Sequence, residues 1–341
     1  MYSAQLTIVS SDTIHKTLSV KHVPLRALKM KEMINKYIWP ISVTIGIIVA
    51  YGIGYPSVYI FKEYGWTVFT VVPFFLGMVP PIVYGAKKEI SKGESIKIGF
   101  STLGIFCLTT LLFAIEGIIC IIMASPIMAL CTWLGTLVGF YLVKNKKIAT
   151  KQMYPFVLLP IIFITLDLSI STKEYLEVKT DITIKAPIET VWQNIISFGE
   201  IDEPDELLFK TGIAYPTHAE IKGSGVGAVR YCNFTTGSFV EPITTWDEPT
   251  LLQFDVLEQP TPMRELNPFW DVHPPHLDGY FQSQKGQFKL IELDNGQTKV
   301  EGTTWYKIHI HPIQYWDVWS KYILHQIHFR VLKHIKKESE K

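Results

Sequence analysis

The sequence predicts an α-helical membrane region of five transmembrane helices, followed by an α+β domain whose antiparallel sheet curves around a long C-terminal helix. Residues 1–171 contain long apolar runs and carry 15 Lys/Arg against 7 Asp/Glu. Residues 172–341 alternate as soluble chains do and carry 17 Lys/Arg against 24 Asp/Glu. We therefore divide the chain into an N-terminal segment (1–36), a membrane region (37–171) and a soluble domain (172–341).

Apolar runs define the membrane region. Residues 37–61 and 66–86 are each long enough to cross roughly 30 Å of hydrocarbon. Residues 98–143 are too long for one span and contain a single charge, so we divide them into two spans at Glu116-Gly117. Residues 153–170 supply a fifth span. We interpret Glu116 as a hydrated carboxylate in a tight outer turn rather than as a functional acid inside the membrane.

Charge in the connections predicts the orientation of these spans. Lysine and arginine concentrate before the first span and after the second and fourth, whereas the first and third connections are nearly free of them. The basic residues are Arg26, Lys29, Lys31, Lys36, Lys87, Lys88, Lys92, Lys97, Lys144, Lys146, Lys147 and Lys151. Because basic loops remain in the cytoplasm, this pattern predicts a cytoplasmic N-terminus and an extracytoplasmic C-terminal domain.

The pattern of the soluble half predicts one strand, a short helix, several further strands and a long terminal helix. The period-two segments that we expect to be strands are 177–184, 218–222, 227–235, 238–246, 251–257, 286–293 and 299–310. Helical spacing of apolar residues predicts a short helix after Ala186-Pro187 and a long amphipathic helix over 312–337. This order is typical of a curved sheet that wraps a helix.

Several stretches of this half resemble a known superfamily. The segments VKTDITIKAPIETVWQNI, GVGAVRYCNFTTGSFVEPITTWDEP, HPPHLDGY and EGTTWY are similar to START-like, or SRPBCC, proteins of the Bet v 1 and polyketide cyclase type, including membrane-anchored members. The resemblance covers residues 173–340 and implies the helix-grip fold, with a deep, mostly apolar cavity between the sheet and the C-terminal helix. Because the superfamily hosts carriers, receptors and enzymes, it does not specify an activity.

One charged pair is expected inside that cavity. A hairpin over Thr236-Gly237 makes Arg230 and Glu241 diagonal neighbours on one face, since Cys232 then lies opposite Glu241. Charges on an apolar face need a partner, so we expect the two to contact each other. The pair either orients the polar end of a ligand or is only a structural salt bridge.

The proline-rich and aromatic stretch 259–281 is predicted to be a lid over the cavity. Its motif HPPHLD places His273, His276 and Asp278 where they either contact a ligand, act in acid–base chemistry, bind a metal ion or fasten the loop. Trp270 is expected either in the lipid headgroup region or in a small core of the loop. Trp305 is expected on a polar face that lines the cavity or is solvated.

We expect a membrane-anchored protein that binds a hydrophobic or lipid-like small molecule and contacts membrane lipids. The alternative is a cyclase- or hydrolase-like enzyme that uses His276 and Asp278 with Arg230 and Glu241, and a third is a scaffold for another envelope protein. No cofactor or metal ion is predicted, because no zinc-ligand spacing occurs. The acidic soluble half argues against nucleic-acid binding.

Overall fold

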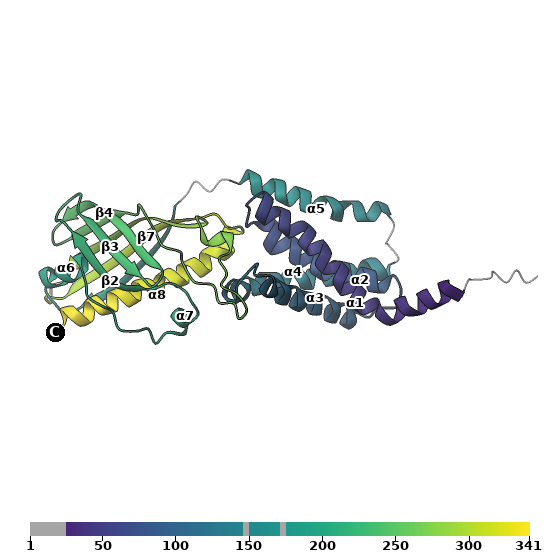
Figure 1. Ribbon diagram of the computed structural model, residues 1–341. Coiled ribbons are helices and arrows are strands. Elements are labelled where there is room, and N and C mark those ends of the chain that lie inside the picture. Colours follow the sequence, from purple (N-terminus) through teal and green to yellow (C-terminus); the bar gives the residue numbers. More distant parts are fainter. Residues whose placement is uncertain (1–24, 146–149, 171–174) are drawn as a thin grey trace, which may run out of the picture.

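The computed structural model describes residues 25–145, 150–170 and 175–341, so most of the predicted N-terminal segment lies outside the described residues. The first part of the chain is helical (Figure 1). Its elements are α1 (Leu25–Tyr55), the π-helical turns η2 (Pro56–Ile60) and η3 (Thr67–Val71), α2 (Val72–Gly85), α3 (Lys92–Leu112), α4 (Ile118–Lys144) and α5 (Thr150–Ser169).

Four of these helical segments are long and apolar enough to cross a membrane, namely Lys36–Ile60, Thr67–Gly85, Lys92–Leu112 and Ile118–Lys144. The predicted division at Glu116-Gly117 is confirmed, since α3 ends at Leu112 and α4 begins at Ile118. The apolar part of α5, Tyr154–Ser169, is shorter than these segments. Large apolar side chains are exposed on the surface of the helices, among them Ile48, Leu108, Ile122, Leu130, Val157 and Ile161.

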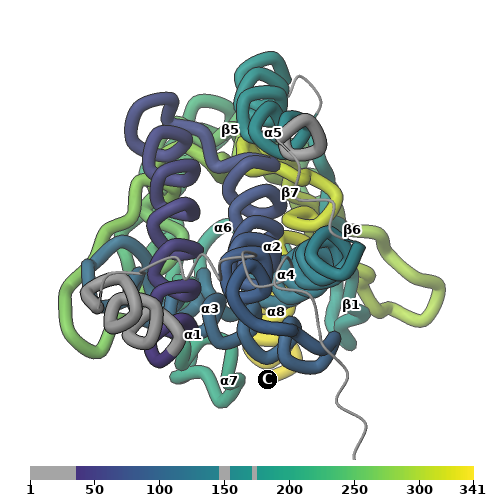
Figure 2. The backbone as a smooth tube through the Cα atoms, turned by 90° about the vertical axis from the view of Figure 1, so that its right-hand side faces the viewer, coloured from purple at the N-terminus to yellow at the C-terminus, as the bar shows by residue number. Residues whose placement is uncertain are grey.

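Small residues let α2 and α4 pack closely. A Cβ atom at Gly77 would overlap the carbonyl oxygen of Thr132, and one at Gly135 would overlap that of Phe74. Such close backbone approach through glycine is typical of helix pairs in membranes, where packing rather than the hydrophobic effect drives association. Figure 2, viewed along the helices, shows α1 to α4 grouped together with α5 to one side.

The link between α5 and the other helices is polar. Asp167 of α5 is buried, and it accepts hydrogen bonds from the backbone N–H groups of Trp66 (2.8 Å) and Thr67 (2.9 Å) and from the Thr67 hydroxyl (2.8 Å). These N–H groups open the helical segment η3-α2, and a carboxylate is favourable at such a helix start. One side chain therefore caps a helix from another part of the chain.

The C-terminal part is an α+β domain. Its strands are β1 (Leu176–Ile184), β2 (Pro216–Lys222), β3 (Val229–Phe234), β4 (Gly237–Asp247), β5 (Leu251–Asp255), β6 (Phe281–Glu292) and β7 (Thr298–Ile308). Its helices are α6 (Ile188–Ile196), α7 (Leu207–Lys210), the 3-10 turn η4 (Pro275–Leu277) and α8 (Ile313–Ser339). The predicted strands and both predicted helices are therefore present, with shifted ends.

The seven strands form one antiparallel sheet in the order β1-β7-β6-β5-β4-β3-β2, and the sheet curls around α8 (Figure 1). The helix α6 follows β1, and α8 contacts β1, β7 and β2. A curled sheet that holds a long C-terminal helix is the helix-grip arrangement.

One predicted register was wrong. The β3–β4 turn consists of Thr235 and Thr236, one residue earlier than expected, so Arg230 lies directly opposite Glu241 and Cys232 opposite Phe239. The pairing thereby moves by two residues, which preserves the face on which each side chain lies.

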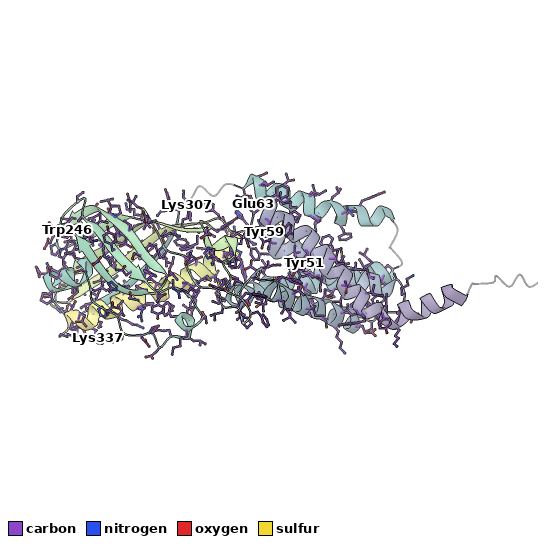
Figure 3. The ribbon with its side chains drawn as sticks, viewed as in Figure 1. Tyr51, Tyr59, Glu63, Trp246, Lys307 and Lys337 are labelled. Atoms are coloured by element: carbon purple, nitrogen blue, oxygen red, sulfur yellow. The ribbon has the colours of Figure 1, made fainter. Side chains whose placement is uncertain are left out.

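The main core of this domain lies at the end away from α1 to α4, which we call the membrane helices below because of their length and apolar composition. Ile188, Val191, Trp192 and Ile195 form the buried stripe of α6, as the helical spacing predicted. The Trp192 ring meets the edge of Trp246 at a centroid separation of 5.7 Å. Figure 3 places Trp246 far from Tyr51 and Tyr59, which belong to the helical part. The space between these two ends holds the cavity described below.

Candidate functional site

One cavity of about 330 Å³ is lined by both parts of the chain. From the membrane helices it receives apolar residues of α1 to α4, including Ala50, Tyr51, Val72, Phe106 and Met128. From the helix-grip domain it receives residues of the sheet and of α8, including Phe254, Phe288, Ile308, Leu324 and Leu332. The cavity implied by the family resemblance therefore extends beyond the domain into the space among the membrane helices.

Arg230 and Glu241 form an ion pair that lines the cavity where it is enclosed by the domain. The Arg230 Nη1 donates to Glu241 Oε2, and both side chains are almost fully buried. The guanidinium also lies 5.5–5.6 Å from the ring centroids of Phe198, Phe254 and Phe288. Three aromatic faces and one carboxylate thus surround the cation, and each is favourable for a guanidinium.

Burial controls protonation around this pair. Burial raises the pKa of Glu241, although Arg230 opposes the effect. Burial also raises the pKa of the neighbouring Cys232 thiol to about 12. Because the thiolate is the reactive form of cysteine, Cys232 is not an activated nucleophile. The pair is suited to holding a polar group, and Cys232 acts as a small apolar side chain beside it.

The stretch 259–281 connects the domain to the membrane helices. The Asn267 side chain donates to the carbonyl oxygen of Leu111 (3.0 Å), and the Trp270 indole N–H donates to that of Leu112 (2.9 Å). The backbone N–H of Ile118 donates to the carbonyl oxygen of Leu266 (2.7 Å). The stretch therefore binds carbonyl groups at the end of α3 and an N–H group at the start of α4, where a helix lacks part of its internal hydrogen bonding.

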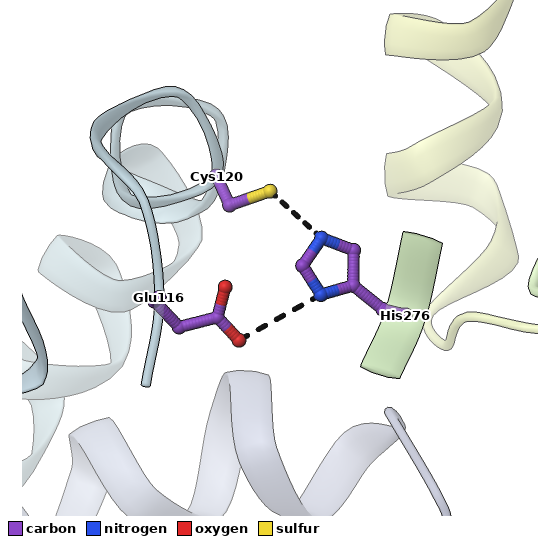
Figure 4. A group of neighbouring side chains, drawn as sticks. All are labelled: Glu116, Cys120 and His276. Carbon is purple, nitrogen blue, oxygen red and sulfur yellow. Dashed lines mark hydrogen bonds and ion pairs between the residues drawn. The ribbon is translucent and has the colours of Figure 1, made fainter. Parts of the chain in front are cut away.

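A second polar cluster lies where this stretch meets the turn between α3 and α4. The His276 ring has its Nε2 3.0 Å from Cys120 Sγ and its Nδ1 3.7 Å from Glu116 Oε1 (Figure 4). The Cys120 thiol also contacts the Glu265 carboxylate, and the Tyr64 hydroxyl donates to Glu116 Oε1 at 3.3 Å. We call Glu116, Cys120, Glu265 and His276 the junction cluster. Glu116, Cys120 and His276 line the cavity.

The junction cluster is short of positive charge. Burial, with the nearby carboxylate of Glu265, raises the pKa of Glu116 to about 8. Burial raises the pKa of Glu265 as well and lowers that of His276 to about 4, so the imidazole is neutral at pH 7. Glu116 is therefore not the hydrated carboxylate expected of an outer turn, because the 259–281 stretch covers it and leaves its side chain 20% exposed.

The remaining predicted site residues lie apart from the cavity. His273 Nε2 contacts Asp278 Oδ2 at 2.9 Å, with both side chains more than half exposed, and neither residue lines the cavity. Trp270 is 55% exposed. The Trp305 indole N–H donates to Glu177 Oε2 (2.9 Å) outside the cavity lining. Of the predicted set, only Arg230, Glu241 and His276 line the cavity, the first two as a pair and His276 in the junction cluster. A binding role for any of them stays a prediction.

Three residues of the junction cluster were absent from the predicted site. Cys120 and Glu265 join Glu116 and His276 across about 150 residues of sequence, which no local pattern reveals. One signal was present: Glu116 is the one charged residue in the apolar run 98–143, and Cys120 follows it in the first turn of the next helix.

The strand order and the long helix α8 give this part of the chain the helix-grip fold. Neither a protein-family model nor a curated protein sequence matches the chain. Among solved structures, a Nitrosospira multiformis protein is 18% identical, covering 48% of this chain and 96% of its own, with a TM-score of 0.31. Norcoclaurine synthase from Thalictrum flavum is 12% identical, with coverages of 49% and 96% and a TM-score of 0.32.

A third similar structure is an aromatase/cyclase from Streptomyces, which is 13% identical over 49% of this chain and 94% of its own, with a TM-score of 0.31. The similarity lies in the C-terminal half. The assignment of the fold depends on the strand order and on α8 rather than on these scores.

Proposed function

We propose that this protein is a membrane-anchored binding protein for a hydrophobic, lipid-like molecule, which it takes from the bilayer into the helix-grip domain. The observation that carries this proposal is a cavity lined by both the membrane helices and the domain. A soluble carrier needs no opening among membrane helices, and a simple anchor needs no shared cavity. A molecule that dissolves in the bilayer would reach the domain through this cavity without crossing water.

The lining of the cavity supports an amphiphile with a long apolar part. Aliphatic and aromatic side chains make up most of the lining, and the charged groups gather at the Arg230–Glu241 pair and at the junction cluster. Apolar pockets with a few placed polar groups are typical of sites that orient a ligand by its polar end. We assign the Arg230–Glu241 pair to the polar group of a ligand inside the domain.

The proposal includes the predicted topology, with α5 as a fifth span and the N-terminus in the cytoplasm. The connection between η2 and η3 and the C-terminal end of α3 contact the domain, and the basic residues Lys87, Lys88, Lys92 and Lys144 belong to the opposite ends of the helices. The domain would then lie outside the cytoplasm, as the distribution of basic residues favours.

Identification of copurifying lipids tests the proposal. Full-length protein would be purified in a mild detergent, and its retained lipids would be compared by mass spectrometry between Val256→Trp and Val226→Trp. Val256 lines the cavity, whereas Val226 is 68% exposed and does not line it, so the same substitution fills the cavity in only one variant. We expect the wild type and Val226→Trp to retain an enriched lipid and Val256→Trp to lose it. Equal retention in both variants, or no enriched lipid in the wild type, would contradict the proposal.

The geometry gives less support to the enzyme that would use His276 and Asp278 together. The two ring nitrogens of His276 face Cys120 and Glu116, and Asp278 contacts His273 instead. A general acid–base pair needs its two groups within hydrogen-bond reach. Binding is therefore the function that the arrangement favours.

A further inference from the structure

The junction cluster brings three kinds of metal ligand together. One carboxylate oxygen of Glu116, the Sγ of Cys120 and one ring nitrogen of His276 all lie within 4.8 Å of one another. They come from the turn before α4, from α4 itself and from η4, and all three line the cavity that the two parts of the chain share. Figure 4 shows the three side chains converging on a common space, with the imidazole between the thiol and the carboxylate.

Buried polar atoms in this cluster have no partner among the described residues. These atoms are Glu116 Oε2, Glu265 Oε2 and His276 Nδ1. The His276 and Glu265 side chains are only 9% and 7% exposed. Buried acceptors of this kind are rarely left unsatisfied, because desolvation without a hydrogen bond is costly. Two carboxyl groups, a thiol and an imidazole, with no Lys or Arg in contact among the described residues, form a set that a bound cation would satisfy.

A nucleophilic cysteine is the competing interpretation, because Cys120, His276 and Glu116 are ordered like a thiol, a base and an orienting carboxylate. Such a cysteine needs a positive surrounding that stabilises the thiolate. Here the sulfur contacts the Glu265 carboxyl group and has that of Glu116 nearby, and no Lys or Arg among the described residues contacts it. A divalent cation would supply the missing positive charge and bind the sulfur directly.

We propose that Glu116, Cys120 and His276 bind one divalent zinc-type cation at the junction between the membrane helices and the helix-grip domain. Thiolate sulfur, imidazole nitrogen and carboxylate oxygen are the ligands that zinc takes in proteins, at distances of about 2.0–2.3 Å. Tetrahedral geometry at those distances separates ligand atoms by roughly 3.3–3.7 Å, so small side-chain rotations close the site. Glu265 lies beside the sulfur as a further carboxylate.

The proposed ion has a structural consequence. Two of its ligands belong to the membrane part of the chain and the third to the 259–281 stretch, so the ion joins the two parts at the point where the cavity passes between them. This inference is independent of the proposed lipid binding, since zinc content and lipid retention are separate measurements.

Metal analysis of the purified full-length chain tests the proposal. Protein in detergent and a reducing buffer would be stripped with a chelator, then titrated with zinc or with cobalt as a spectroscopic probe. We expect one ion per chain and, with cobalt, a thiolate-to-metal charge-transfer band. Cys120→Ser should abolish that band, and Glu116→Gln or His276→Gln should weaken zinc binding by ~10-fold or more.

Matched controls make each outcome decisive. Cys131→Ser alters another cysteine of α4, and His218→Gln alters a histidine of β2, and both should bind zinc as the wild type does. Unfolding curves of the metal-free variants identify any change that disrupts folding, and Glu116→Gln provides a second ligand change that nearly preserves shape. The absence of stoichiometric zinc, or wild-type affinity in Cys120→Ser, would overturn the proposal.

Discussion

At the residue scale, the stability of the domain depends on the pairing of two buried charges, Arg230 and Glu241. A buried ion pair adds little net stability, but an unpaired buried charge is costly. Removal of one partner by Glu241→Ala should therefore destabilise the domain by about 3–5 kcal/mol, whereas Arg230→Met with Glu241→Leu should be markedly less harmful. Denaturant unfolding of the full chain in detergent, followed by tryptophan fluorescence, would measure both changes.

A control for this experiment lies on the surface of the same domain. Lys337 and Asp202 form an ion pair with side chains 59% and 80% exposed. Asp202→Ala should leave the unfolding midpoint nearly unchanged, because exposed pairs are well solvated. If the double apolar variant were as unstable as Glu241→Ala, the unpaired charge would not be the cause of the loss.

His328 of α8 predicts how the stability of the fold depends on pH. Its Nε2 lies 2.8 Å from Thr304 Oγ1 and its Nδ1 3.0 Å from Thr180 Oγ1, and burial, with the neighbouring His325, lowers its pKa to about 4. In the unfolded chain the His328 imidazole is protonated near pH 6.5, whereas in the folded chain it is protonated only near pH 4. The contribution of His328 to the free energy of unfolding is therefore complete above pH 6.5 and is lost as the pH falls from 6.5 to 4.

The test compares unfolding midpoints of the wild type and His328→Gln between pH 7 and pH 4. The wild type should lose stability more steeply on acidification, since the variant has no imidazole to protonate at this position. Parallel curves for the two proteins would show that His328 does not contribute to the acid sensitivity.

At the scale of the elements, alanine substitution should have different effects on thermal stability at a glycine in the α2–α4 contact and at a glycine of α3 where an added Cβ would contact nothing. Gly77 faces the backbone of α4, whereas a Cβ at Gly104 of α3 meets no atom within 4 Å. Gly77→Ala should lower the thermal midpoint of the helical part, because overpacking costs about 1–3 kcal/mol. Gly104→Ala should leave the midpoint unchanged or raise it slightly, since alanine favours helix. Equal effects would mean that α2 and α4 do not pack through Gly77.

Most elements of the domain were predictable because their signals are local. Alternation identified β1 and β4, and apolar spacing identified α6 and α8. The hairpin register was not, because Thr235-Thr236 and Thr236-Gly237 are both acceptable turns in a local view. Gly237 pairs with Phe234 and is therefore the first residue of β4, and its φ of 145° is a conformation that glycine adopts readily.

The site was predictable only in part, for a physical reason. Arg230 and Glu241 belong to neighbouring strands, so period-two alternation puts them on one face. His276 and Cys120 meet only because the 259–281 stretch packs on the end of α3 and the start of α4, a tertiary contact between hydrogen-bonding groups distant in sequence. A lid over a pocket was expected there, and the structure shows a stretch that also fixes the domain to the membrane helices.

At the scale of the whole molecule, the domain and the membrane helices share contacts along one junction. Phe69 of η3 packs against Trp316 of α8 at a centroid separation of 4.8 Å, and the backbone N–H of His311 donates to the carbonyl oxygen of Tyr64 (3.0 Å). With the 259–281 stretch, these contacts hold the domain against one end of the helical part (Figure 1), and the cavity is lined by residues of both. The position of the domain is thus a condition for the proposed function.

Photo-crosslinking in vesicles tests whether lipid reaches the domain from the bilayer through the shared cavity. The full-length protein would be reconstituted with a phospholipid that carries a photoactivatable group in its acyl chain, and labelled peptides would be identified by mass spectrometry. We predict labels at cavity residues of both parts, such as Phe106 of α3 and Phe288 of β6, with the domain label lost in Val256→Trp. Labels confined to outward-facing residues such as Ile122 and Ile161 would contradict a shared path for lipid from the bilayer into the domain.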